Sequence, residues 1–104
     1  MRKQYHKLVR DRIPEIIENS GKTCRTQVLD DKTYLQLLDE KLGEELAEYQ
    51  ESKSLEELAD LLEVMEAVVA AWGYTWEQLQ AVKAEKKAAR GGFVEKILLL
   101  EVSE

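Results

Sequence analysis

The chain has 104 residues, enough for one hydrophobic core and too few for two ordinary domains, so we expect a single domain over residues 1–104. Its formal charge of -6 argues against nucleic acid as a partner, because duplex binding needs a basic surface. The single cysteine, Cys24, and the lack of a signal-like or membrane-length apolar run predict a cytoplasmic protein that does not enter a membrane.

The N-terminal part of the chain predicts one short helix followed by one strand. Pro14 suits the first turn of a helix, which should end near Asn19 with Gly21 in the left-handed position beyond it. Residues 23–29 are rich in β-forming side chains, and residues 93–102 near the C-terminus have a similar character. We expect these two segments to pair as a small β-ribbon against the helices.

Two long helices are predicted next. Asp30 or Asp31 can cap a helix over roughly 32–51, in which leucines recur at spacings of three and four. Ser54 opens a second helix that ends at Gly73, and Ser54 with Glu57 has the spacing of a capping box. The break between the two helices is short, which predicts an antiparallel pair.

A third long helix completes the predicted fold. The segment Thr75-Trp-Glu-Gln78 is another capping-box sequence, and Gly91-Gly92 should stop the helix that it begins. The expected fold is therefore mainly α, an antiparallel helical bundle of three long helices with the short N-terminal helix and the small ribbon.

The second long helix is apolar over more than half of its circumference. One stripe carries Leu61, Val64 and Val68, and a second stripe carries Leu58, Leu62, Met65, Val69 and Trp72. A helix of this kind is buried on several sides, and so short a chain has few other elements to cover it. We therefore expect a homodimer or a higher homo-oligomer.

Four carboxylates flank the break between the first two long helices. Glu45 and Glu48 precede it, Glu57 and Asp60 follow it, and each pair is spaced to share one side of a helix. In an antiparallel hairpin Glu45 would face Asp60, and Glu48 would face Glu57. Because four converging negative charges repel each other in a poorly hydrated cleft, a stable arrangement needs a cation or shared protons. Our hypothesis is a divalent-metal site.

The residue types favour magnesium over other metals. An EF-hand takes its ligands from an Asp-rich loop, whereas these carboxylates belong to helices. A di-iron bundle uses Glu-x-x-His pairs, and His6, the single histidine, lies outside the pattern. Magnesium prefers oxygen ligands, keeps several waters and is often completed by substrate phosphates, so the pattern suggests hydrolysis of a nucleotide, with Mn²⁺ as a substitute metal.

The run Glu44-Glu45-x-x-Glu48 followed by Glu57-x-x-Asp60 resembles the EExxE…ExxD signature of the all-α nucleotide pyrophosphohydrolases. This MazG-like group is related to phosphoribosyl-ATP pyrophosphohydrolase and to the dimeric dUTPases. The flanking segments 7–17 and 90–93 are similar to a small MazG-like subfamily, so the resemblance covers nearly the whole chain. The spacer between Glu48 and Glu57 is shorter than is usual in the group, which implies a tight hairpin.

The resemblance implies Mg²⁺-dependent hydrolysis of a nucleoside triphosphate to the monophosphate and pyrophosphate, as a removal of unwanted nucleotides. It implies that Glu45, Glu48, Glu57 and Asp60 hold the metal and that Glu44 either assists in the reaction or only stabilises the site. Glu48 is our first choice for the group that accepts a proton from the attacking water. The candidates for the phosphate tail are basic residues near both ends of the chain, namely Lys83, Lys86, Lys87, Arg90, Arg10 and Arg12.

Other interpretations of the same residues compete with the enzymatic one. The carboxylate of Glu57 can simply complete the capping box with Ser54, and basic side chains near a helix end can simply complement the helix dipole. A non-catalytic nucleotide or metal sensor, or a structural helical oligomer with solvated acids, are the alternatives to an enzyme.

Overall fold

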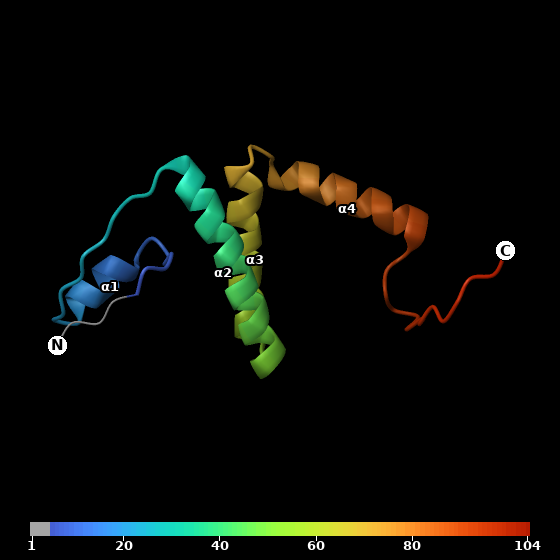
Figure 1. Cartoon of the computed structure of the whole chain (residues 1–104), viewed down its shortest axis with the longest axis horizontal. Coiled ribbons are helices and arrows are strands. Elements are labelled where there is room, and N and C mark those ends of the chain that lie inside the picture. The colour runs from blue at the N-terminus through green and yellow to red at the C-terminus, as the bar shows by residue number, and fades with distance from the viewer. Residues whose placement is uncertain (1–4) are drawn as a thin grey trace.

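The computed structural model describes residues 5–104 and contains four helices in that range (Figure 1). They are α1 (Ile13–Asn19), α2 (Asp31–Ser52), α3 (Leu55–Ala71) and α4 (Trp76–Arg90). The prediction of a mainly α fold with three long helices and a short N-terminal one is confirmed. Among the described helices, none is long and apolar enough to cross a membrane.

The helix boundaries follow from the capping residues. Asp30 accepts a hydrogen bond from the backbone N–H of Thr33 at 2.7 Å, and this bond lowers the pKa of the Asp30 carboxyl. At α4, Thr75 and Gln78 form the predicted capping box, in which each side chain accepts from the other residue's backbone N–H. Gly91, with a φ of 81°, lies just beyond Arg90 and ends α4.

The capping box of α4 leads to a direct test of helix stability. Thr75→Ala should lower the free energy of unfolding by about 1 kcal/mol, because the backbone N–H of Gln78 loses its acceptor. Thr75→Ser keeps the hydroxyl and should stay close to the wild type. Urea unfolding followed by circular dichroism measures the difference, and equal losses in both variants would contradict the assignment.

The helices α2 and α3 form an antiparallel hairpin that is the centre of the molecule (Figure 1). Only Lys53 and Ser54 separate the two helices, so the turn is as tight as the short spacer predicted. Lys53 takes a left-handed φ of 57°, and its backbone N–H donates to the carbonyl of Tyr49 at 2.7 Å. Leu38 of α2 is the buried hydrophobic residue of the described chain.

The other two helices make little contact with this hairpin. Of the two, only α4 packs on it to any extent, and it touches α3 near the turn that joins them before it extends away into solvent (Figure 1). The described residues span 63 × 31 × 24 Å with a radius of gyration of 18.6 Å. A compact chain of this length would have a radius of gyration of about 13 Å. The single chain therefore leaves much of its apolar surface open.

The predicted β-ribbon was wrong. Residues 23–29 and 93–102 contain no strand, and they lie on opposite sides of the hairpin (Figure 1). An isolated two-stranded ribbon is marginal in water, so β-forming side chains alone cannot hold two distant segments together. The C-terminal segment instead leaves Phe93 and Ile97 exposed.

Candidate metal centre

The tight hairpin brings the predicted carboxylates of α2 and α3 together. Oxygen atoms of Glu45, Glu57 and Asp60 all lie within 4.8 Å of one another, and so do oxygen atoms of Glu44, Glu45 and Glu48. Oxygens on opposite sides of one octahedral Mg²⁺ are about 4 Å apart, twice the metal–oxygen distance. Either group is therefore close to the size of a coordination shell.

The two groups share Glu45. This arrangement differs in detail from the two facing pairs that we predicted, Glu45 with Asp60 and Glu48 with Glu57. Glu45 and Asp60 do come together, whereas Glu48 and Glu57 belong to different groups among the described residues. Glu48 lies with its own helix neighbours on the α2 side. The structure therefore offers a three-carboxylate site across the hairpin, with Glu44 and Glu48 beside it.

Glu45 is the central residue of these carboxylates. It is 6% exposed and is the buried charged residue of the described chain. One oxygen lies 3.3 Å from the ammonium nitrogen of Lys41, and the other, Oε2, has no hydrogen-bond partner. Burial raises the pKa of Glu45, an effect that Lys41 opposes and that the nearby Glu48 charge reinforces. An unpaired buried carboxylate oxygen costs free energy unless something supplies the missing positive charge.

Glu57 shows which of its two interpretations the structure favours. The hydroxyl of Ser54 accepts from the backbone N–H of Glu57 at 3.3 Å, which is one half of a capping box. The reciprocal bond is missing, because the backbone N–H of Ser54 donates to the hydroxyl of Ser52 at 3.2 Å. The Glu57 carboxylate is instead directed at Glu45 and Asp60, and its Oε2 is buried without a partner. A second residue of this group therefore has a buried carboxylate oxygen without a hydrogen-bond partner.

Three cations of the described residues reach these five carboxylates. Lys41 of α2 contacts Glu44 and Glu45, whereas Lys7 and Arg10 come from the segment before α1. Arg10 donates to Asp60 at 2.6 Å. Sequence reasoning missed Lys41 as part of the site, although its spacing of three and four residues from the two glutamates is that of helix ion pairs. It missed Lys7 as well, and no local pattern signals that long-range contact.

The six predicted phosphate-binding residues separate into two sets. Arg10 lies at the carboxylates, whereas Arg12 is 82% exposed at its side chain and pairs with Glu15 of α1 at 3.4 Å. The four α4 residues, which are Lys83, Lys86, Lys87 and Arg90, are exposed on the helix that extends away from the hairpin. Within one chain the structure does not bring these four cations to the carboxylates.

The donor set fits a hard divalent cation. Every nearby candidate ligand atom is a carboxylate oxygen, and two of the oxygens are buried without a partner. Mg²⁺ and Mn²⁺ favour such oxygens, whereas Zn²⁺ sites usually include the nitrogen or sulfur ligands that these groups lack. Fold and site together define an all-α helical hairpin with a carboxylate cluster suited to a divalent ion.

Comparison with known proteins adds little to this description. No protein-family model matches the chain, and no solved structure matches it. A stretch of 41 residues is 56% identical to part of an uncharacterised protein of Mycolicibacterium smegmatis. The match covers 39% of this chain and 42% of that protein, so the chain matches less than half of its relative's length.

Proposed function

We propose that the protein is a Mg²⁺-dependent nucleoside triphosphate pyrophosphohydrolase of the cytoplasm, with Mn²⁺ as a substitute ion. The observation that carries this proposal is the buried Glu45, whose unpartnered oxygen lies where carboxylates of two helices converge. The resemblance of the same residues to the EExxE…ExxD signature supports the choice of reaction. A metal-binding cluster alone would fit many hydrolytic reactions.

The residues would divide the work as follows. Glu45, Glu57 and Asp60 would hold the ion, which supplies charge neutralisation and a water of lowered pKa. Glu48 lies beside this set and would accept the proton of the attacking water as the pyrophosphate leaves. Glu44, held by Lys41 at 3.5 Å, would keep the ammonium group next to Glu45. The triphosphate itself would be positioned by cations, first of all Arg10.

Asp60→Asn tests the reaction directly. This change keeps the size of the side chain but removes one carboxylate charge from the cluster, so pyrophosphate release should fall at least about a hundredfold, by analogy with lost metal-site residues. The measurement is pyrophosphate release over a panel of canonical and modified nucleoside triphosphates with Mg²⁺ or Mn²⁺. Asp39→Asn, on α2 and outside both carboxylate groups, is the matched control.

The panel also separates the alternatives. Product analysis should show the nucleoside monophosphate together with pyrophosphate for at least one substrate. Nucleotide binding without turnover across the whole panel would contradict the enzyme and favour a sensor of the same fold. If neither Mg²⁺ nor Mn²⁺ changes the thermal stability, the remaining interpretation is a structural helical oligomer.

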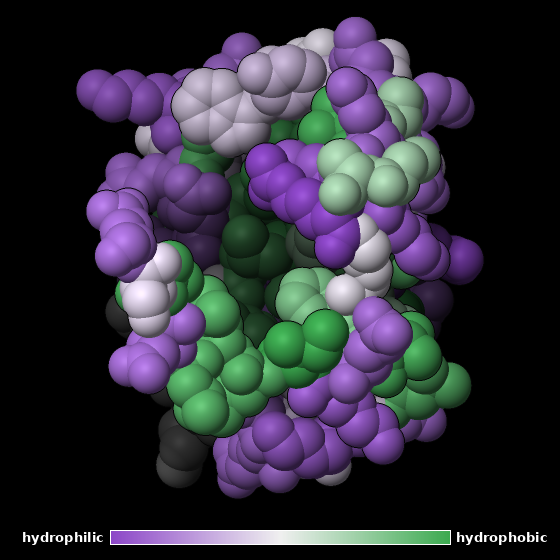
Figure 2. Space-filling view, turned by 90° about the vertical axis from the view of Figure 1, so that its right-hand side faces the viewer, coloured by the Kyte–Doolittle hydropathy of each residue, from purple (hydrophilic) through white to green (hydrophobic). Residues whose placement is uncertain are grey.

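We propose further that the functional unit is a homodimer or a higher homo-oligomer. The described surface measures 9943 Å², whereas a compact folded monomer of this mass exposes about 6,000 Å². Hydrophobic side chains lie open at the surface between charged ones on the face seen in Figure 2. The most regular exposed set follows α3, with Leu55, Leu58, Leu62 and Met65 at spacings of three and four and with Trp72, the C-cap residue, seven positions after Met65. Such a stripe is the packing seam of a coiled-coil-like helix pair.

A further inference from the structure

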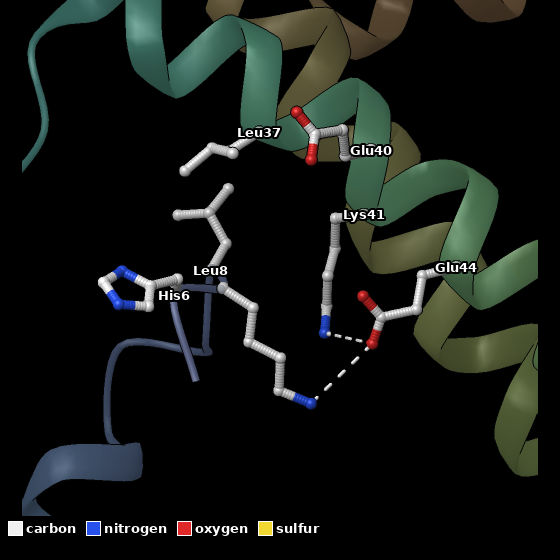
Figure 3. A pocket seen from close by; sticks show the side chains of 7 residues that line it. His6, Leu8, Leu37, Glu40, Lys41 and Glu44 are labelled. Carbon is white, nitrogen blue, oxygen red and sulfur yellow. Dashed lines mark hydrogen bonds and ion pairs between the residues drawn. The ribbon is translucent and has the colours of Figure 1, made fainter. Parts of the chain in front are cut away.

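The segment before α1 lies across the carboxylate cluster. Lys7 contacts Glu44 of α2 at 3.7 Å, and Arg10 contacts Asp60 of α3 at 2.6 Å. In Figure 3 the side chain of Leu8 points towards Leu37 of α2, and both line a small hollow between the segment and that helix. Residues 6–10, which we call the strap, therefore touch both helices of the hairpin.

The strap is held on the hairpin by half-exposed ion pairs and by the half-buried Leu8. Lys7 pairs with Glu44 and Arg10 pairs with Asp60, which are both carboxylates of the cluster, and Arg10 also lies 4.0 Å from a carboxylate oxygen of Glu63. The side chains of Lys7 and Arg10 are 47% and 56% exposed. Leu8 is half-buried, and the hollow that it lines with Leu37 has a volume of about 40 Å³. Half-exposed ion pairs are weak and are easily exchanged for other partners. A cation that binds these carboxylates more strongly than Lys7 and Arg10 do would therefore displace these side chains and change the position of the strap.

Arg10 binds a residue that a divalent ion would also bind. Asp60 is the α3 carboxylate that completes the group with Glu45 and Glu57, and it is the acceptor of the 2.6 Å bond from Arg10. An ion held by this group would lie within a few ångströms of the guanidinium. Two like charges at such a distance repel, and the doubly charged ion interacts more strongly with the three carboxylates than a single guanidinium does with one.

We propose that Arg10 and the divalent cation compete for Asp60, so that binding of the ion releases the strap from the hairpin. This proposal rests on the proposed function to the extent that Asp60 is a metal ligand. Arg10 partly neutralises the cluster in the ion-free protein. After exchange, its guanidinium no longer donates to Asp60 and keeps only the long contact with Glu63, so it can pair with the negative oxygens of a polyphosphate beside the bound ion. The strap then links occupancy of the metal site to the presentation of a phosphate-binding group.

The test compares Arg10→Gln with Arg12→Gln in the full chain, with MgCl₂ as the sole ligand. Both changes remove one positive charge from the same part of the chain, but Arg12 pairs with Glu15 and not with the cluster. Isothermal titration calorimetry should show that Arg10→Gln binds Mg²⁺ up to about fivefold more tightly than the wild type, because no competitor has to leave. Arg12→Gln should bind like the wild type.

Hydrogen–deuterium exchange supplies a second readout that needs no substrate. In the wild type and in Arg12→Gln, Mg²⁺ should increase exchange over residues 6–12. In Arg10→Gln the exchange should already be high without Mg²⁺ and should not respond to it. Unchanged or slower exchange in the wild type on adding Mg²⁺, or equal affinities of the two variants, would overturn the competition.

The two proposals fail in different ways. If Mg²⁺ and Mn²⁺ bind none of the three proteins, the proposed metal site and the proposed competition for Asp60 are both wrong. If the ions bind, stabilise the fold and depend on Asp60, but the strap does not respond, only the competition is wrong and Arg10 is a fixed neighbour of the site.

Discussion

Glu45→Gln is expected to abolish the stabilisation of the protein by Mg²⁺ and, at the same time, to make the ion-free protein more stable at neutral pH. Glu45 is the single carboxylate shared by both groups, so no ion can be held across the hairpin at full strength without it. At about a hundred times its dissociation constant, Mg²⁺ should add about 2.7 kcal/mol to the free energy of unfolding of the wild type. The variant should lose most of this gain, together with at least about a hundredfold in pyrophosphate release.

The opposite effect without metal follows from the raised pKa of Glu45, which burial causes. Well below the ordinary pKa of a glutamate, the folded and unfolded states both carry the proton and the charge has no cost. As pH rises, the unfolded state loses its proton first, so the free energy of unfolding falls until the raised pKa is passed. Glutamine has no such penalty, so the variant should become more stable than the wild type as pH rises above the ordinary pKa of a glutamate.

Thermal melts over a pH series, with and without Mg²⁺, measure both effects in one experiment. Glu51→Gln is the matched control, because Glu51 is an exposed glutamate of the same helix that belongs to neither carboxylate group. The Glu51→Gln protein should still be stabilised by Mg²⁺, and its difference in stability from the wild type should not grow with pH. A Glu45→Gln protein that is still stabilised by Mg²⁺ to the same extent would show that the ion binds elsewhere.

The helices and the hairpin could be predicted because the residues that determine them lie close together in the sequence. Asp30, Ser54 and Thr75 each cap the helix that follows, and each lies within one turn of the N–H group that it satisfies. The closeness of Glu45 and Asp60 followed from a two-residue turn and antiparallel packing alone. No long-range information was needed for either result.

The parts that could not be predicted depend on distant contacts. The contact of Arg10 with Asp60 joins residues 50 positions apart and depends on where an irregular segment lies. The direction of α4, and with it the place of the basic residues on it, depends on the few contacts at the start of the helix. The burial of Glu45 was indicated only in part by the sequence, in which Glu45 directly precedes Leu46 of the leucine pattern of this helix.

Leu62→Glu is expected to break the proposed dimer, because Leu62 lies in the middle of the exposed α3 stripe. It is 45% exposed in the single chain, with Leu58 one turn before it and Met65 one turn after it. Burying the exposed 45% of Leu62 against a partner is worth about 1 kcal/mol, and the symmetry of a dimer counts the change twice. Burying the new charge costs still more, so the dissociation constant should rise at least about a hundredfold.

Light scattering coupled to size-exclusion chromatography gives the mass of each species, and circular dichroism shows whether the helices persist. Leu62→Met keeps the volume and hydrophobicity of the side chain and should remain a dimer. A Leu62→Glu protein of unchanged oligomeric mass would exclude the α3 stripe as the interface, and a monomeric wild type would exclude the oligomer itself. If Leu62→Glu is monomeric and helical but loses pyrophosphate release, a second copy completes the site, and the exposed cations of α4 become the groups to test there.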